Sequence, residues 1–172
     1  MTVQTDYHYR SMRASVFCIV ILLTSDPMSG QDRPSPTSLK GLKGVFLQVY
    51  ADRGLQQAME TRTKQRLREA GITLLGEKDW ELLPDTALLH LDVIIRCERD
   101  EVSCGYSVGL KLGQHVQLTR GQRAIITATT WHNSYTGSVS KAHLTNLPDL
   151  LALDAGTLLL NFISDYHSAN PQ

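Results

Sequence analysis

The chain has 172 residues, enough for one domain with a core of its own. Its 17 basic and 17 acidic residues give a formal net charge of zero, which excludes a generic binder of nucleic acid or other polyanions. Apolar residues make up 42% of the chain, too large a share for intrinsic disorder. The composition therefore predicts one folded domain.

An apolar run of about eleven residues stands near the N-terminus, at residues 14–24, behind Arg10 and Arg13. A short apolar run after basic residues is typical of a secretory signal peptide, and this run is too short to span a membrane. We therefore expect residues 1–30 to be a signal peptide and the mature, exported protein to have no transmembrane span. The alternative is a buried helix at the start of the fold.

The segment that follows, residues 31–38, has two prolines and no apolar residue, which predicts a flexible linker. The single folded domain is expected over residues 39–172. Its first element is a strand at residues 44–50, where apolar residues occupy alternate positions. Residues 55–70 then have one apolar helical face, and Gly71 is a suitable C-terminal stop.

The middle of the chain has the pattern of a sheet. Residues 72–75 suit a short strand, and Trp80 is expected to anchor the loop after it to the core. Three strand patterns then follow, at residues 88–97, 105–120 and 123–132. Because consecutive strands usually pair, we expect an antiparallel meander.

The last part of the chain combines a loop with a helix. Residues 132–145 are polar and lack periodicity, so we expect a long loop and a candidate functional element. Asn146 and Pro148 are typical of a helix start, and apolar residues recur after them at spacings of three and four. The order strand, helix, three strands, helix (β-α-β-β-β-α) predicts an α+β two-layer sandwich. In it, two helices cover one face of a four-stranded, mainly antiparallel sheet.

Cys97 and Cys104 stand on either side of a charged stretch. Removal of a signal peptide would also remove Cys18 and leave an even number of cysteines in an oxidising compartment. If Asp100 and Glu101 form a two-residue turn, the two remaining cysteines lie opposite each other, within reach of a disulfide. We expect a structural disulfide. Free thiols are an alternative, whereas zinc and redox sites usually need other spacings.

Alternation along the predicted strands separates an apolar face from a polar one. The polar face is either solvated or meets a partner. The residues of this candidate interaction surface are His90, Asp92, Lys111, His115 and Gln117 from the strands, with His132 and Tyr135 from the expected loop.

Three stretches, "LKGLKGVFLQVY", "RLREAGITLL" and "FISDYHSANP", resemble a family of small uncharacterised bacterial exported proteins. The resemblance spans most of the chain after residue 38 and implies no catalytic residues. The order of strands and helices is also similar to that of periplasmic assembly domains, such as the N-terminal domain of the Tol translocation protein and the outer-membrane lipopolysaccharide assembly lipoprotein. This similarity of fold implies an accessory or binding role.

Two enzymatic alternatives rest on short patterns. The sequence "GYSVG" around Ser107 matches a hydrolase nucleophile elbow, but such an elbow needs a strand that turns into a helix, and here another strand follows. His90, Asp92 and His115 are suitable zinc ligands if their strands bring them together, and ordinary surface histidines otherwise. We find no phosphate loop, dinucleotide fingerprint or EF-hand pattern in the sequence, and we expect no cofactor.

The sequence as a whole predicts an exported, envelope-associated binding or assembly accessory domain with a protein or envelope-component partner. No catalytic activity is evident. The alternative is a small exported hydrolase or metal-binding enzyme that uses Ser107 or the pair His90 and His115.

Overall fold

The computed structural model describes residues 36–97, 103–118 and 125–171, all of which belong to the unit formed by residues 33–172. The predicted signal peptide, most of the predicted linker and the turn at Asp100 and Glu101 lie outside the described residues. Four strands form one sheet in the order in which they follow along the chain. They are β1 (Gly44–Tyr50), β2 (Thr86–Cys97), β3 (Ser103–Gln117) and β4 (Ile125–Ser140).

The sheet is mainly antiparallel. β1 pairs with β2 in parallel, whereas β2 with β3 and β3 with β4 are antiparallel pairs. The parallel pair arises because α1 (Arg53–Glu69) crosses over the sheet between the two strands. The predicted antiparallel meander of β2, β3 and β4 is confirmed.

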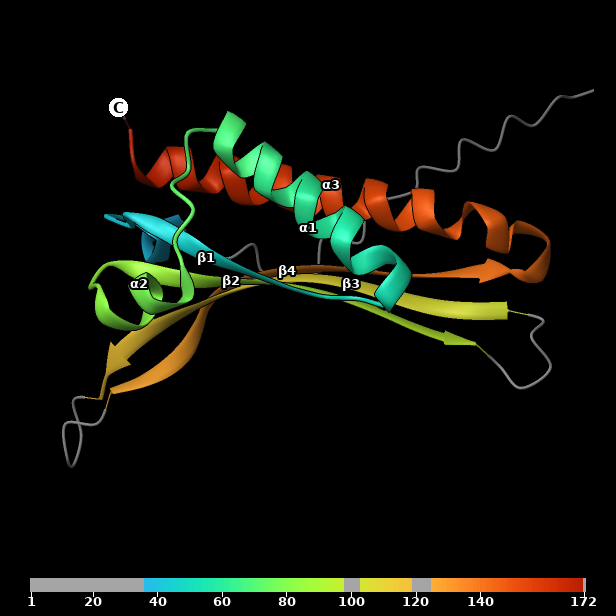
Figure 1. The fold of residues 1–172 in the computed structure, drawn as a ribbon, viewed down its shortest axis with the longest axis horizontal. Coiled ribbons are helices and arrows are strands. Elements are labelled where there is room, and N and C mark those ends of the chain that lie inside the picture. Colours follow the sequence, from blue (N-terminus) through green and yellow to red (C-terminus); the bar gives the residue numbers. More distant parts are fainter. Residues whose placement is uncertain (1–35, 98–102, 119–124, 172) are drawn as a thin grey trace, which may run out of the picture. The chain divides into compact units, whose positions relative to one another are not determined.

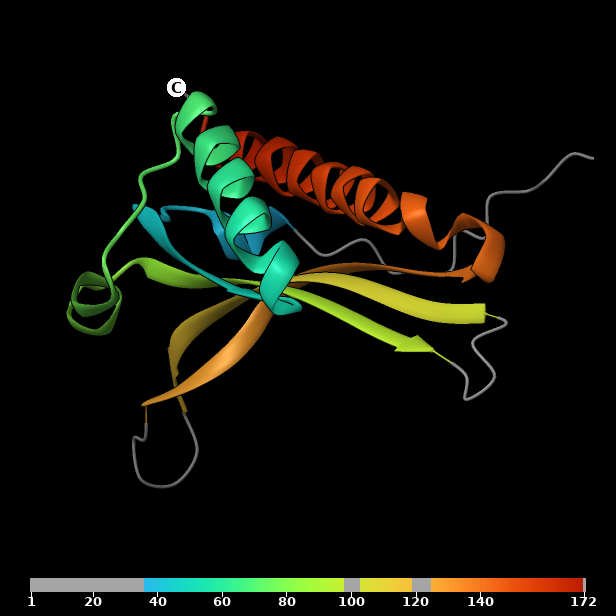
Figure 2. The ribbon, with the colours of Figure 1, turned by 45° about the vertical axis from the view of Figure 1, so that its right-hand side comes forward.

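Two long helices cover one face of this sheet, as predicted. Figures 1 and 2 show α1 and α3 (Leu147–Ala169) on the same side. α1 packs against β1, and α3 packs against β3 and β4. At the contact between the helices, Arg66 of α1 lies against Gly156 of α3, with its Nη1 atom 3.4 Å from the glycine carbonyl oxygen. The architecture is therefore the predicted α+β two-layer sandwich.

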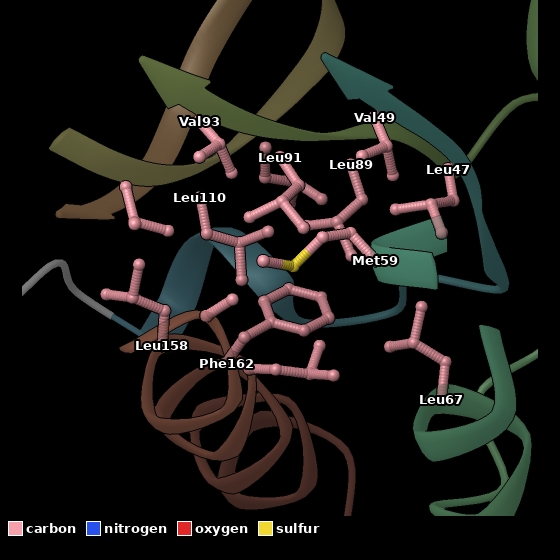
Figure 3. Close-up of a cluster of buried hydrophobic side chains, with 14 of the residues drawn as sticks. Leu47, Val49, Met59, Leu67, Leu89, Leu91, Val93, Leu110, Leu158 and Phe162 are labelled. Carbon is pink, nitrogen blue, oxygen red and sulfur yellow. The ribbon is translucent and has the colours of Figure 1, made fainter. Parts of the chain in front are cut away.

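The core lies between the sheet and these helices (Figure 3). Alternate residues of each strand point into it, and α1 and α3 add residues three or four positions apart. Each fully buried aliphatic side chain contributes about 1.5–3 kcal/mol. The side chains labelled in Figure 3 are Leu47, Val49, Met59, Leu67, Leu89, Leu91, Val93, Leu110, Leu158 and Phe162.

Two expectations about local structure are wrong. The expected loop around Trp80 contains a helix, α2 (Glu77–Leu82). Trp80 is buried, but it stacks on His115 of β3 and is not part of the core cluster to which it was expected to anchor the loop. β4 runs through most of the loop expected at residues 132–145, and the 3₁₀ helix η2 (Lys141–Asn146) takes up the rest. A second 3₁₀ helix, η1 (Pro36–Leu39), includes the end of the predicted linker.

Two polar contacts hold α3 against the sheet, one from β4 and one from β3. The indole Nε1 of Trp131 donates a hydrogen bond to the Asp165 carboxylate at 3.0 Å. Tyr106 of β3 lies across Gly137 of β4, and its hydroxyl is hydrogen-bonded to Asp154. Partial burial, together with that hydrogen bond and the charge of Asp154, raises the pKa of Tyr106 above its ordinary value.

Gly137→Ala is expected to lower the free energy of unfolding by about 1–3 kcal/mol, because the new methyl group would overlap the Tyr106 ring. A Cβ at this position would stand 2.6 Å from the ring Cζ and hydroxyl oxygen. Gly109→Ala is the matched control, since its nearest neighbour would be 3.9 Å away. Urea denaturation of both variants is the measurement, and equal losses would contradict the proposed overlap.

The helical segment Lys141–Ala169 is long and apolar enough to cross a membrane, judged by length and composition alone. Core helices of soluble proteins meet the same criterion. Within α3, Leu151, Leu158 and Phe162 are fully buried against the sheet. We therefore interpret α3 as a core helix.

Candidate functional site

The face of the sheet opposite α1 and α3 carries most of the predicted interaction residues. Strand pairing aligns Gln48, His90, Lys111 and His132 in one row across all four strands. The next row begins with Tyr50 and Asp92. Because paired residues point to the same side of a sheet, these side chains lie next to one another. We call Tyr50, His90, Asp92, Lys111 and His132 the open-face cluster.

Asp92 stands at the centre of the open-face cluster. One of its carboxylate oxygens accepts a hydrogen bond from the Lys111 ammonium at 3.2 Å. The other lies 3.2 Å from Nε2 of His90. Asp92 is thus placed between two groups that can carry positive charge, and its side chain is 24% exposed, so the interactions are only partly screened by water.

His90 is held between Asp92 and an aromatic ring. Its ring centroid lies 4.6 Å from that of Tyr50, with the planes inclined at 53°. The His90 Nε2 atom is buried and makes no hydrogen bond of acceptable geometry, although it is within ion-pair distance of Asp92. The contact is therefore an ion pair only when the imidazole is protonated. Tyr50 itself is 52% exposed and presents an aromatic surface to solvent.

His115 and Gln117 are separated from the open-face cluster. His115 is four residues beyond Lys111 on β3, a distance of about 13 Å along a strand. Its ring stacks on Trp80 of α2, with centroids 4.1 Å apart and planes at 11°. Both residues line a hollow of about 610 Å³ at the end of the sheet, beside the exposed apolar side chains Leu82 and Ile125.

Tyr135 lies on the other face of the sheet. It pairs with Val108, which is fully buried under the helices, so its side chain points to the helix side. The expectation that Tyr135 and His132 belong to one loop is wrong, because both are on β4 and point to opposite faces. Tyr50 was not among the predicted site residues, although alternation along Gly44–Tyr50 places it opposite the buried face.

Cys97 and Cys104 form the expected disulfide. They pair directly across β2 and β3, with Cα atoms 4.0 Å apart. Cys104 is fully buried, whereas Cys97 is exposed. The bond links β2 to β3 at the end of the hairpin. Neither cysteine is then available as a nucleophile or a metal ligand.

The structure does not assemble either predicted enzymatic site. Ser107 lies within β3, opposite Ile94 and Thr136, instead of at a turn into a helix. His90 and Asp92 are neighbours, but His115 is held by Trp80 away from them. Among the described residues, no group of three or more His, Cys, Asp or Glu side chains is placed to hold a metal ion.

A comparison with protein-family models and with curated protein sequences finds no match.

Proposed function

We propose that this chain is an exported, envelope-associated accessory domain that binds a partner protein through the open-face cluster. The observation that carries the proposal is the composition of the uncovered sheet face. Its centre combines a half-exposed aromatic ring with opposite charges that are 3.2 Å apart. Tyrosine is among the residues that are enriched at protein interfaces and at the positions that contribute most of their binding energy.

The form of the surface favours a protein over a small molecule as the partner. A sheet face presents its side chains next to one another over several strands, whereas sites for small ligands are usually concave. Export is supported by the disulfide, because such bonds persist in oxidising compartments, and by the apolar run at residues 14–24. An envelope location also agrees with the similarity of strand and helix order to periplasmic assembly domains.

Site-specific photo-cross-linking in the native host tests the proposal. A photoreactive amino acid replaces Ile94, which is 47% exposed on the open face next to Asp92 along β2. The matched control carries it at Gln56, an exposed residue of α1 on the opposite side. We expect an adduct of one defined mass at position 94 and none at position 56. Asp92→Asn should reduce its yield about tenfold, because the charge at the centre of the surface is lost.

Three outcomes would contradict the proposal. The first is the absence of a specific adduct at position 94. The second is an adduct whose yield does not change with Asp92→Asn. The third is an adduct of twice the mass of the chain, which would identify a second copy on the open face in place of a different protein.

A further inference from the structure

α1 and α3 lie side by side on the sheet (Figures 1 and 2), and a narrow groove follows their contact. The groove consists of two adjoining hollows of about 60 and 100 Å³, which share three lining residues. A water molecule takes up about 30 Å³ in the liquid, so the groove has room for a small ligand only. The lining of the larger hollow is mainly apolar and comprises Leu55, Ala58, Met59, Pro148 and Ala152, with Arg62 and Asp149 as its charged residues.

Two arginines of α1 line the smaller hollow. Arg62 and Arg66 are four residues apart and therefore lie on the same side of the helix. Arg62 makes no hydrogen bond or ion pair with any described residue. Arg66 has one contact, from Nη1 to the Gly156 carbonyl oxygen, and its length of 3.4 Å is beyond the usual range of a hydrogen bond. Lys64 of the same helix is paired with Glu60, whereas neither arginine has a carboxylate partner in the part of the chain that the structure describes.

The lining of the smaller hollow also includes a buried threonine. Thr63 is only 6% exposed, and its hydroxyl makes no hydrogen bond to another described residue. Thr61 and Thr157 instead donate to the backbone carbonyl four residues before them, a common arrangement for threonine in a helix. Polar groups that are hidden from bulk water normally have a partner. The Thr63 hydroxyl is therefore available to a ligand that enters the hollow.

Gly156 gives the Arg66 side chain its place in the groove. Glycine is unfavourable in the interior of a helix, and Gly156 lies in the middle of α3. A Cβ at this position would stand 3.0 Å from Nη1 of Arg66, so alanine would push the guanidinium group away from α3. Glycine at this position thus allows Arg66 to lie against α3, beside the smaller hollow.

From these features we infer that the groove between α1 and α3 binds a short aliphatic carboxylate. The smaller hollow has about the volume of two water molecules, which suits the two oxygens of a carboxylate. These oxygens accept hydrogen bonds from Arg62, Arg66 and Thr63, because a guanidinium group matches the geometry of a carboxylate. The aliphatic tail lies in the larger, apolar hollow. The site is on the helix side of the sheet and does not depend on the function proposed for the open-face cluster.

NMR titration of the isotope-labelled full chain, with its disulfide intact, tests the inference. The probe is sodium butyrate, and sodium chloride keeps the ionic strength of the reference sample equal. We expect saturable shifts of amide signals along the groove, with a Kd of about 1–10 mM. Arg66→Gln should raise this Kd about tenfold or more, because a charge-assisted hydrogen bond is lost. Arg68→Gln is the matched control, since Arg68 is exposed on the same helix but lines neither hollow, and it should leave the Kd unchanged.

Three further variants separate binding from stability. Thr63→Val removes the hydroxyl but keeps the size of the side chain, and should raise the Kd about threefold or more. Gly156→Ala should also raise the Kd, although urea denaturation should show no loss of stability, because alanine favours the helix. Asp149→Asn should lower the Kd about twofold, because Asp149 lines the larger hollow and repels the carboxylate. A purely structural role of these residues would not change affinity in opposite directions.

Butanamide and inorganic phosphate are the control ligands. Butanamide has the same tail without the charge and should bind about tenfold more weakly or not at all. Phosphate has no apolar part for the larger hollow and should also bind more weakly than butyrate. The absence of saturable shifts up to about 100 mM butyrate would overturn the inference. So would a Kd that neither Arg66→Gln nor Thr63→Val changes, or binding of butanamide or phosphate that is as tight as that of butyrate.

Discussion

Trp131→Ala is expected to lower the free energy of unfolding by about 3–5 kcal/mol, the largest effect of any substitution considered for this domain. Trp131 is 1% exposed, and its ring meets Phe162 of α3 edge to face, with centroids 5.3 Å apart. Alanine would leave a large cavity between β4 and α3. It would also remove the donor to the buried carboxylate of Asp165, an additional cost for an acceptor that is hidden from water.

Urea denaturation of the Trp131→Ala and Trp80→Ala variants tests the contribution of Trp131 to the free energy of unfolding. Trp80 is also buried, but it stacks on the exposed ring of His115 at the end of the sheet, outside the layer between the sheet and α3. Its replacement should therefore cost less, about 1–3 kcal/mol. A larger loss for Trp80→Ala than for Trp131→Ala would show that the link between β4 and α3 is not central to stability.

Loss of the disulfide is expected to lower the free energy of unfolding by about 2–3 kcal/mol, because the bond closes a short loop in the unfolded chain. The two cysteines are seven residues apart. The variant carries Cys97→Ala together with Cys104→Ala, and the measurement is urea denaturation of variant and oxidised wild type. The strand register should persist without the bond, since neighbouring pairs such as Val93 with Val108 remain buried.

The reduced wild-type protein is the control that separates the effect of the cross-link on stability from the effect of side-chain packing. It keeps the sulfur of Cys104 in its buried position but has lost the cross-link. If the cross-link is responsible, the reduced protein and the double alanine variant should lose similar stability. A loss confined to the alanine variant would instead assign the effect to packing of Cys104 in the core.

The fold was predictable because the buried elements have strong periodicity. Leu89, Leu91 and Val93 alternate with polar residues on β2, and the buried positions of α3 recur at spacings of three and four. The directly opposed cysteines gave the register of the β2–β3 pair. These patterns are local features of the sequence, and they identify the residues that form the core.

The second half of β4 could not be recognised in the same way. After Trp131 the next residue of this strand that is buried is Val139, and small polar residues fill most of the positions between them. These residues form a strand because β3 supplies their hydrogen bonds, an interaction at long range that leaves no hydrophobic period in the sequence. α2 was missed for a related reason, since its six residues include a single buried side chain, Trp80.

The candidate site was predicted in part. Alternation correctly placed His90, Asp92 and Lys111 on the open face, and strand pairing then brings them into contact. Tyr135 was misplaced because its assignment depended on the expected loop. His115 is separated from the open-face cluster because it stacks on Trp80. This contact between a helix and a strand cannot be read from the spacing of residues along the chain.

The intact mass of the protein from the host's exported fraction tests whether this chain is an exported domain with a disulfide between Cys97 and Cys104. Samples are alkylated before and after reduction. We predict a product that lacks about the first 30 residues. Its two remaining thiols, Cys97 and Cys104, should be blocked to alkylation until reduction. A full-length product in the cytoplasm with thiols that react without reduction would contradict the claim.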